Sequence, residues 1–304
     1  KYYPIEMSKV IDFVKENKGR YALIGIPCFI KSVRLLAQKN EKIKERIKFY
    51  IGLVCGHLKS DMFAKSMGWQ MGVEPDNLIK IDFRDKLEGR PSNDYGVKVE
   101  GTIDGETKTL RAARRELYTT NWGQGLFKYN ACEFCDDVLS ETADVTVGDA
   151  WLPEYKSDSM GTNIIIVRHP VIKDIRENAG GKISIKELSA EKIYQSQAGG
   201  FRHRRDGLAY RLYLKDEKNE WRPAKRVKPD NNLPTKRKKV YEHRMRLSKE
   251  SFKAYKLARK VNDFNAFIDY MDPLVQEYNK VIKRSFTRRV LSKIKHGMYR
   301  LIKK

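Results

Sequence analysis

The sequence predicts an α/β fold: a mainly parallel sheet with βαβ units and an inserted antiparallel hairpin, followed by a helical, basic C-terminal extension. Three observations lead to this prediction. Segments of helical period alternate with short apolar runs over the first 90 residues. Residues 97–110 alternate apolar and polar side chains around Asp104 and Gly105. From residue 189 onward the pattern is helical and rich in Lys and Arg.

The pattern of the first 90 residues predicts helices and strands in strict alternation. The expected elements are a helix at 7–17, a strand at 21–26, a helix at 29–39, a strand at 48–54 and a helix at 60–71. This order is typical of βαβ units and of a parallel sheet. Cys28 and Cys55 each follow an apolar strand, and ligands bind at the carboxyl ends of strands in open α/β sheets. We therefore expect both thiols at one edge of the sheet.

Later segments complete the predicted core. They are the hairpin at 97–110, a strand ending in a glycine turn at 143–151, a short buried strand at 163–170, a helix near 170–178 and a strand at 183–188. The predicted domains are an α/β domain at 1–215, a basic linker at 216–240 and a helical basic extension at 241–304. Residues 221–240 contain three prolines and eight basic residues. The stretch has too few apolar residues to form a core, so it is predicted to be a linker. Two helical runs follow, with a break expected at Pro273.

The cysteines form too sparse a set for a disulfide framework, since there are four in 304 residues. Reduced thiols in a cytoplasmic protein are the better interpretation. No segment approaches the roughly 18 to 20 apolar residues of a membrane span. Cys132 and Cys135 are separated by two residues, whereas Cys28 and Cys55 are solitary. From this spacing alone an iron-sulfur cluster remains open against zinc or plain buried thiols.

The net charge of +23 is concentrated at one end of the chain. Residues 201–304 carry a net charge of +20 and residues 1–200 only +3. In residues 281–304 apolar side chains recur at helical spacing among Lys and Arg. Such a helix can lie on an anionic membrane, or can pack its apolar stripe on the core. Binding to nucleic acid is the less favoured interpretation, because no recognisable nucleic-acid-binding motif accompanies the basic residues.

Several short motifs together resemble one known family. They are Ile-Gly-Ile-Pro-Cys (24–28), Gly-Leu-Val-Cys-Gly (52–56), Phe-Arg-Asp-Lys (83–86), Cys-Glu-Phe-Cys-Asp (132–136) and Ala-Asp-Val-Thr-Val-Gly-Asp-Ala-Trp (143–151). In order and spacing they resemble the beta subunit of coenzyme F420 hydrogenase and dehydrogenase, over about residues 20–215. The resemblance implies an oxidoreductase, an iron-sulfur flavoprotein with FAD beside a 4Fe-4S cluster.

The resemblance also implies site residues. The cluster ligands would be Cys28, Cys55, Cys132 and Cys135. The flavin pocket would lie around Gly148, Asp149 and Ala150 and around Gly161, Thr162 and Asn163. Because glycine turns admit a pyrophosphate and cations complement its charge, we add Lys31, Arg34, Lys86 and Arg168 as candidates.

These residues predict a protein that moves electrons between a two-electron donor, such as reduced coenzyme F420 or a ferredoxin, FAD and the cluster. The expected partners are a ferredoxin or an N-terminal ferredoxin module, and an anionic membrane surface through the C-terminal basic helix. The expected location is cytoplasmic, peripheral on the inner face of the membrane. The alternative is a zinc-stabilised or metal-free interaction module that binds anionic membrane or nucleic acid through its basic C-terminal third.

Overall fold

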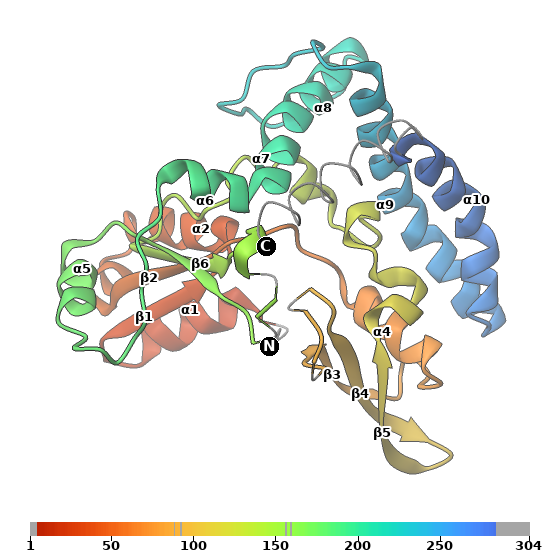
Figure 1. The fold of residues 1–304 in the computed structure, drawn as a ribbon, viewed down its shortest axis with the longest axis horizontal. Helices are drawn as coiled ribbons and strands as arrows, with labels where there is room; N and C mark the ends of the chain where they lie inside the picture. Colours follow the sequence, from red (N-terminus) through yellow and green to blue (C-terminus); the bar gives the residue numbers. More distant parts are fainter. Residues whose placement is uncertain (1–4, 88, 92, 156, 159, 284–304) are drawn as a thin grey trace, which may run out of the picture. The chain divides into compact units, whose positions relative to one another are not determined.

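The computed structural model describes residues 5–87, 89–91, 93–155, 157–158 and 160–283. The chain divides into two compact units (Figure 1). The first comprises residues 1–121 and 127–232, and the second comprises residues 122–126 and 233–304.

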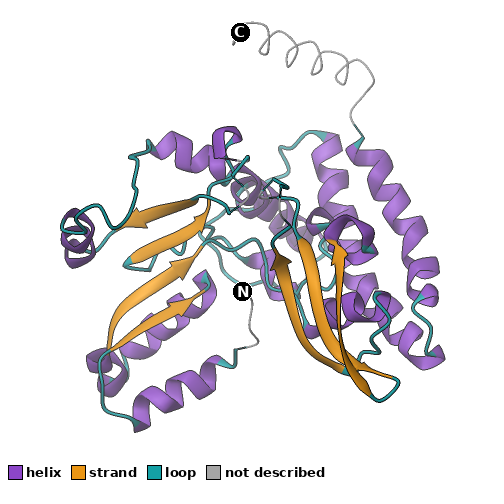
Figure 2. Ribbon diagram, turned by 60° about the horizontal axis from the view of Figure 1, so that its bottom comes forward, coloured by secondary structure: helices purple, strands orange, loops and turns teal. Residues whose placement is uncertain are grey.

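The first unit contains two sheets, whose strands are orange in Figure 2, with their helices. It also contains several short 3-10 turns. Its strands are β1 (Tyr21–Gly25), β2 (Ile47–Leu53), β3 (Leu78–Asp85), β4 (Gly96–Ile103), β5 (Glu106–Ala113), β6 (Val145–Asp149) and β7 (Asn163–Val167). Its helices are α1 (Met7–Glu16), α2 (Pro27–Ala37), α3 (Glu41–Arg46), α4 (Asp61–Gln70), α5 (Pro170–Glu177), α6 (Ala190–Ser196), α7 (Ala198–Arg204) and α8 (Asp206–Glu217). The 3-10 turns are η1 (Arg114–Glu116), η2 (Tyr118–Thr120), η4 (Asn130–Phe134) and η5 (Pro153–Tyr155).

The larger sheet has the strand order β1-β2-β6-β7. The pairs β1–β2 and β2–β6 are parallel, and β7 runs antiparallel to β6. Ile51 of β2 is opposite Ile24 on one side and Val145 on the other. This sheet confirms the predicted α/β class with a mainly parallel sheet.

One apolar cluster joins α1, α2 and α3 to the first two strands of this sheet. Its buried members are Ile11, Val14, Leu23, Ile30, Val33, Ala37, Ile43, Ile47, Tyr50 and Ala143. On α2 the buried residues Ile30, Val33 and Ala37 recur every three to four positions, so they share one face of the helix. Burial of this face fixes α2, and therefore the cysteine in its first turn, against the sheet.

The smaller sheet is antiparallel, with the order β3-β4-β5. The hairpin predicted around Asp104 and Gly105 is present as β4 and β5. Both turn residues have positive φ, 54° for Asp104 and 80° for Gly105, as a two-residue turn between twisted strands requires. The third strand, β3, contains the Phe-Arg-Asp-Lys segment up to Asp85 and was not predicted from the sequence.

Two strand predictions need correction. Residues 183–188, predicted as a strand, form no strand, and Ile183 and Ile185 are exposed. Their alternation therefore does not reflect one buried sheet face. The segment predicted as a buried strand at 163–170 forms β7, but this is an edge strand with Ile165 49% exposed.

The second unit is built on two helices, α9 (Thr235–Val261) and α10 (Asn265–Ile282), with the 3-10 turn η3 (Trp122–Gln124). The break between the helices lies at Asn262, which adopts the left-handed conformation at φ 51°, and not at Pro273. Pro273 lies inside α10, so the predicted break there is wrong. The helical basic extension is confirmed in class, and α9 begins within the range predicted as linker. The proposed domain boundaries stay a prediction.

The predicted amphipathic helix at the end of the chain falls largely on residues 284–304, outside the described residues. Within the part that the structure describes, no helix combines the length and the apolar character needed to cross a bilayer.

Candidate metal centre

Cys28 and Cys55 lie beyond the carboxyl ends of adjacent parallel strands. β1 ends at Gly25, and α2 begins at Pro27, whose fixed φ suits the first helical position. Cys28 is therefore in the first turn of α2. Cys55 follows the end of β2 at Leu53, and its backbone N–H donates to the carbonyl of Val138 at 3.4 Å. Both thiols are at the sheet edge that the sequence predicted.

Cys132 lies in the turn η4 and Cys135 directly follows its end, and both precede β6 in the chain. Backbone contacts tie this region to the segment after Cys55. Ser60 N–H donates to Phe127 O at 2.9 Å, and Tyr129 N–H donates to Leu58 O at 3.3 Å. Because β6 also pairs with β2, the two cysteine-bearing segments are held together at both ends.

The four thiols influence one another electrostatically. Although the Cys28 residue is exposed, partial burial of its thiol is the largest cause that raises its pKa, to about 11. The neighbouring thiols Cys55, Cys135 and Cys132 raise it further. Burial is likewise the first cause of the raised pKa values of Cys55 and Cys132. The fold thus brings the four predicted cysteines together, and the raised pKa values favour the protonated thiols of Cys28, Cys55 and Cys132.

Hydrogen-bond donors point at two of the sulfurs. The backbone N–H of Leu58 donates to Cys132 Sγ at 3.3 Å. The side chain of Arg204 hydrogen-bonds the Cys55 sulfur and lowers the pKa of that thiol against the larger effect of burial. Donors of this kind stabilise sulfur when it carries negative charge, as it does in a metal-bound thiolate.

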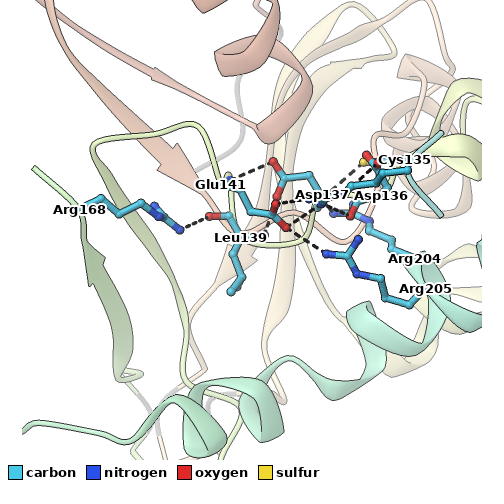
Figure 3. Close-up of polar contacts among 9 residues, drawn as sticks. Cys135, Asp136, Asp137, Leu139, Glu141, Arg168, Arg204 and Arg205 are labelled. Atoms are coloured by element: carbon cyan, nitrogen blue, oxygen red, sulfur yellow. Dashed lines mark hydrogen bonds and ion pairs between the residues drawn. The ribbon is translucent and has the colours of Figure 1, made fainter. Parts of the chain in front are cut away.

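Arg204 is a residue of this site that the sequence analysis did not single out. It ends α7 and is only 2% exposed. Its Nη2 donates to Gly56 O at 2.9 Å, and its Nη1 donates to Asp137 O. Figure 3 shows it beside Cys135 and Asp137. The segment Phe-Arg-His-Arg-Arg contains three arginines, and no local pattern marks which one is buried.

Further buried cations surround the cysteines. Lys128 is 3% exposed and Arg211 is 2% exposed, and both pair with the buried carboxylate of Glu133. The Arg211 Nε to Glu133 Oε2 distance is 3.0 Å. Burial lowers the pKa of Lys128, and Glu133 opposes that effect. One carboxylate therefore serves two buried cations in this network.

Lys59 adds another cation beside this network. Burial, with the charge of Lys128 as the second cause, lowers its pKa to about 7. Its Nζ lies 4.3 Å from the centroid of the Phe63 ring, which stacks in turn on Phe83 with a 5.7 Å centroid separation. A negative group near Lys128 and Lys59 would stabilise their charged forms.

The donor set and its surroundings fit an iron-sulfur cluster. Four cysteines match its usual ligand number, sulfur-directed donors are present, and the buried cations near them suit an anionic group. Among the described residues, no group of three or more His, Cys, Asp or Glu side chains is arranged so that it could hold a single metal ion.

The segments predicted to line a flavin pocket also come together. Asp149 and Asn163 are opposite each other in the β6–β7 pair, and Ala150 N–H donates to Thr162 O at 2.9 Å. Gly148 is required by close packing, because a Cβ there would lie 2.4 Å from Val54 Cγ2. Gly148 is thus explained by contact within the fold.

Gly161 and Lys86 meet near this turn. Gly161 has φ 86°, which favours glycine, and a Cβ built on it would lie 3.7 Å from Lys86 Nζ. Gly161, which has no side chain, therefore lies beside the ammonium group of the exposed Lys86. Asp149 is engaged by Arg84, whose Nη1 and Nη2 lie 3.0 and 2.6 Å from its two carboxylate oxygens.

The remaining candidates are not gathered at that turn. Arg34 donates to Asp144 at 2.6 Å and to Thr142 O at 2.8 Å. Arg168 donates to the carbonyl of Leu139, as Figure 3 shows, and to Thr146 Oγ1 at 2.9 Å. Lys31 is exposed on α2. Arg34 and Arg168 therefore have partners within the fold that account for their positions.

Comparisons with known proteins bear on this site. Residues 18–191 match a family model that describes the C terminus of the coenzyme F420 hydrogenase/dehydrogenase beta subunit. No curated protein matches the chain. Among solved structures, a chain of the xenon-derivatised F420-reducing NiFe hydrogenase complex from Methanosarcina barkeri is similar, with 14% identity and a TM-score of 0.41, covering 67% of each chain.

Proposed function

Because the chain belongs to the coenzyme F420 hydrogenase/dehydrogenase beta subunit family, we propose that it transfers electrons through a 4Fe-4S cluster held by its four cysteines, with FAD bound nearby. The family match spans more than half of the chain and includes all four cysteines. The protein is an oxidoreductase of this family. The cofactors, their ligands and the electron donor are our proposal.

The observation that carries the proposal is the convergence of four thiols from three segments of the chain. The charges of Cys55, Cys132 and Cys135 raise the pKa of Cys28. The antiparallel sheet nevertheless separates Cys28 and Cys55 from Cys132 and Cys135 in the chain. Plain buried thiols need no such convergence, and they need no hydrogen-bond donors directed at sulfur. Four thiolates around iron would use both features.

The charge balance supports the same proposal. Burial lowers the pKa of Lys59, Lys128, Arg204 and Arg211 are almost fully buried, and Glu133 pairs with two of these cations. Buried cations are costly unless an opposite charge compensates them. A cluster with four cysteine thiolates carries net negative charge and would supply that compensation.

Lys86 and Gly161 support the placement of FAD. Gly161 lets a ligand approach the backbone, and the Lys86 ammonium group lies beside it. A pyrophosphate needs both features. Ala150 and Thr162 hold this turn through their backbone hydrogen bond.

When bound, FAD exchanges electron pairs with a donor and the cluster passes single electrons onward. The described residues then have separable tasks. The cysteines hold iron, Leu58 N–H and Arg204 donate to sulfur, and Lys86 binds phosphate. The donor is a two-electron carrier such as reduced coenzyme F420, and the electron partner is a ferredoxin.

The decisive experiment is spectroscopy of protein purified without oxygen, with iron, zinc and flavin analysis. We expect broad absorption near about 400 nm that bleaches with dithionite, and stoichiometric iron and flavin. Cys132→Ser should abolish the cluster spectrum. Ser32→Ala is the matched control, because Ser32 is one turn from Cys28 on α2 and its hydroxyl donates to the Cys28 carbonyl at 2.8 Å. A colourless protein containing zinc or no metal would instead support the interaction module.

A second candidate property, binding to an anionic membrane, is favoured by one face of α9. Exposed basic residues recur along it at spacings of three, four or seven. They are Lys239, Arg246, Lys249, Lys253, Lys256 and Lys260. The opposite face carries buried Val240, Leu247 and Ala254. Each such cation contributes about 1 kcal/mol near an anionic bilayer.

Sedimentation with lipid vesicles tests this property. We expect binding to vesicles containing phosphatidylserine and none to purely phosphatidylcholine vesicles, with loss of binding at high salt. The triple variant Lys249→Gln, Lys253→Gln and Lys256→Gln should weaken binding. Equal binding of this variant would contradict a role for α9.

A further inference from the structure

We propose that Arg204 sets the reduction potential of the cluster and positions its two ligand-bearing loops, an inference that rests on the proposed function. Its guanidinium lies against the Cys55 sulfur and is held there by carbonyl oxygens of both loops. In this role Arg204 acts through Cys55, so it is a positioning residue.

The contacts of Arg204 connect segments far apart in sequence. Gly56, which accepts from Nη2 at 2.9 Å, directly follows Cys55. Asp137, whose carbonyl accepts from Nη1, is two residues beyond Cys135. One rigid guanidinium fork therefore fixes the loop after β2 and the loop before β6 relative to each other.

The charge of Arg204 acts on the sulfurs of Cys55 and Cys132, and it also acts on the carboxylate of Asp137. Among the ion pairs of the described residues, none includes Arg204. The side chain of its neighbour Asp137 is instead engaged with backbone, accepting from Leu139 N–H and Glu141 N–H at 3.0 Å each. Because Arg204 is only 2% exposed, water screens its charge poorly.

A fixed cation and a sulfur-directed donor favour the reduced cluster. Reduction adds one electron, supplied by an external reductant, and so increases the negative charge on the cluster and its sulfurs. The N–H donor and the positive charge of Arg204 stabilise that added charge more than they stabilise the oxidised form. Arg204 should therefore raise the reduction potential.

Arg205 provides a matched control. It is the next residue in the chain, but it pairs with Glu141 at 3.1 Å, and both side chains are about one-third exposed. Figure 3 shows Arg205 directed at Glu141 while Arg204 meets Asp137. Removal of either residue deletes one positive charge, but of the two it is Arg204 that hydrogen-bonds a thiol.

The test is a redox titration with dithionite and mediators, followed by electron paramagnetic resonance, on the full chain purified without oxygen. We expect Arg204→Met to lower the equilibrium constant for one-electron reduction about tenfold, a shift of about 59 mV to more negative potential. Arg204→Lys keeps the charge but cannot reproduce all three contacts, so a smaller negative shift is expected. Arg205→Met should leave the potential unchanged.

Iron content separates the possible failures. If Arg204→Met and Arg204→Lys hold full iron at the wild-type potential, the inference is overturned while the proposed function stands. If the wild-type protein binds no cluster, both are overturned. Where Arg204→Met fails to fold, pulsed resonance of the wild-type reduced cluster with nitrogen-15 arginine decides. Coupling to a guanidinium nitrogen that is lost in Arg204→Lys supports the inference, and its absence from the wild type overturns it.

Discussion

Cationic side chains of the first unit lie in two contrasting settings. Near the cysteines, Lys128, Arg204 and Arg211 are at most 3% exposed, and one carboxylate, Glu133, pairs with both Lys128 and Arg211. Near the strands β2 and β6, two arginines each have a carboxylate partner. Arg34 pairs there with Asp144, and Arg84 with Asp149, each at 2.6 Å.

This contrast separates cations that each pair with a different carboxylate from cations that share one. A partly exposed arginine paired with its own carboxylate needs no further group. A buried cation that shares its carboxylate is stabilised by an additional negative group, or it becomes neutral. The lowered pKa values of Lys59 and Lys128 show the second response.

The largest expected effect comes from the carboxylate in the cation-rich setting. Glu133→Gln leaves Lys128 and Arg211 without their shared partner, so we expect the free energy of unfolding to fall by about 3 to 5 kcal/mol. Urea denaturation under anaerobic conditions measures it. Glu154→Gln removes the exposed partner of Lys192 and should leave stability nearly unchanged. Similar effects of the two substitutions would contradict the contrast.

Lys59 tests the same setting through pH. Its folded-state pKa of about 7 lies below its ordinary 10.5, so the fold disfavours the charged form. That cost is absent above pH 10.5, grows as the pH falls and is constant below about 7. In metal-free protein, Lys59→Met should therefore stabilise the fold by up to about 4 kcal/mol at pH 7 and by almost nothing near pH 10.5. Urea denaturation at several pH values measures this, and an equal gain at every pH would refute the burial argument.

Asp144 tests the balanced setting. Its carboxylate accepts from Arg34 at 2.6 Å and from Tyr50 N–H at 2.7 Å. Asp144→Ala should lower the free energy of unfolding by about 2 kcal/mol, because both donors lose their acceptor. Flavin content should stay at the wild-type value if Arg34 serves the fold. Loss of flavin without loss of stability would instead restore Arg34 as a cofactor contact.

The smallest effect on stability is expected at the partly exposed ion pair of Arg226 and Glu141. Arg226 Nη1 lies 2.6 Å from Glu141, and this contact is the first cause that lowers the pKa of Glu141. Because the pKa is lowered, the ion pair stabilises the fold at pH values above 4.5, the ordinary pKa of the carboxyl group. This stabilisation is lost as the pH falls through the folded-state pKa. Arg226→Met should therefore cost about 0.5 kcal/mol near neutral pH and less in acid, at about pH 3. Denaturation curves at both pH values measure this loss of stability. An equally large loss in acid would contradict the prediction.

Much of the sheet could be predicted because its signals are local. Alternation around Asp104 and Gly105 predicts a hairpin, and apolar runs followed by Cys28 and Cys55 predict strand ends. β3 was missed because its exposed and half-buried residues give a weak apolar pattern. Residues 183–188 show the reverse error, since their Ile residues alternate without a sheet to pack on.

The candidate site divides in the same way. The cysteines could be named from spacing and resemblance. The burial of Arg204 and Arg211 could not, because arginine is usually a surface residue and these two are buried only by contacts between distant segments. Pro273 was misjudged because proline usually ends a helix, whereas α10 continues through it.

The insertion of β3, β4 and β5 between the two cysteine pairs has a kinetic consequence. β1 and β2 pair across a short helical connection, but Tyr50 and Asp144 are 94 residues apart in sequence. Contacts of such long range form slowly, because the chain must close a large loop before they contribute any stability. During refolding, Cys28 and Cys55 should therefore meet well before Cys132 and Cys135 arrive, and an early intermediate would hold a half-formed metal site.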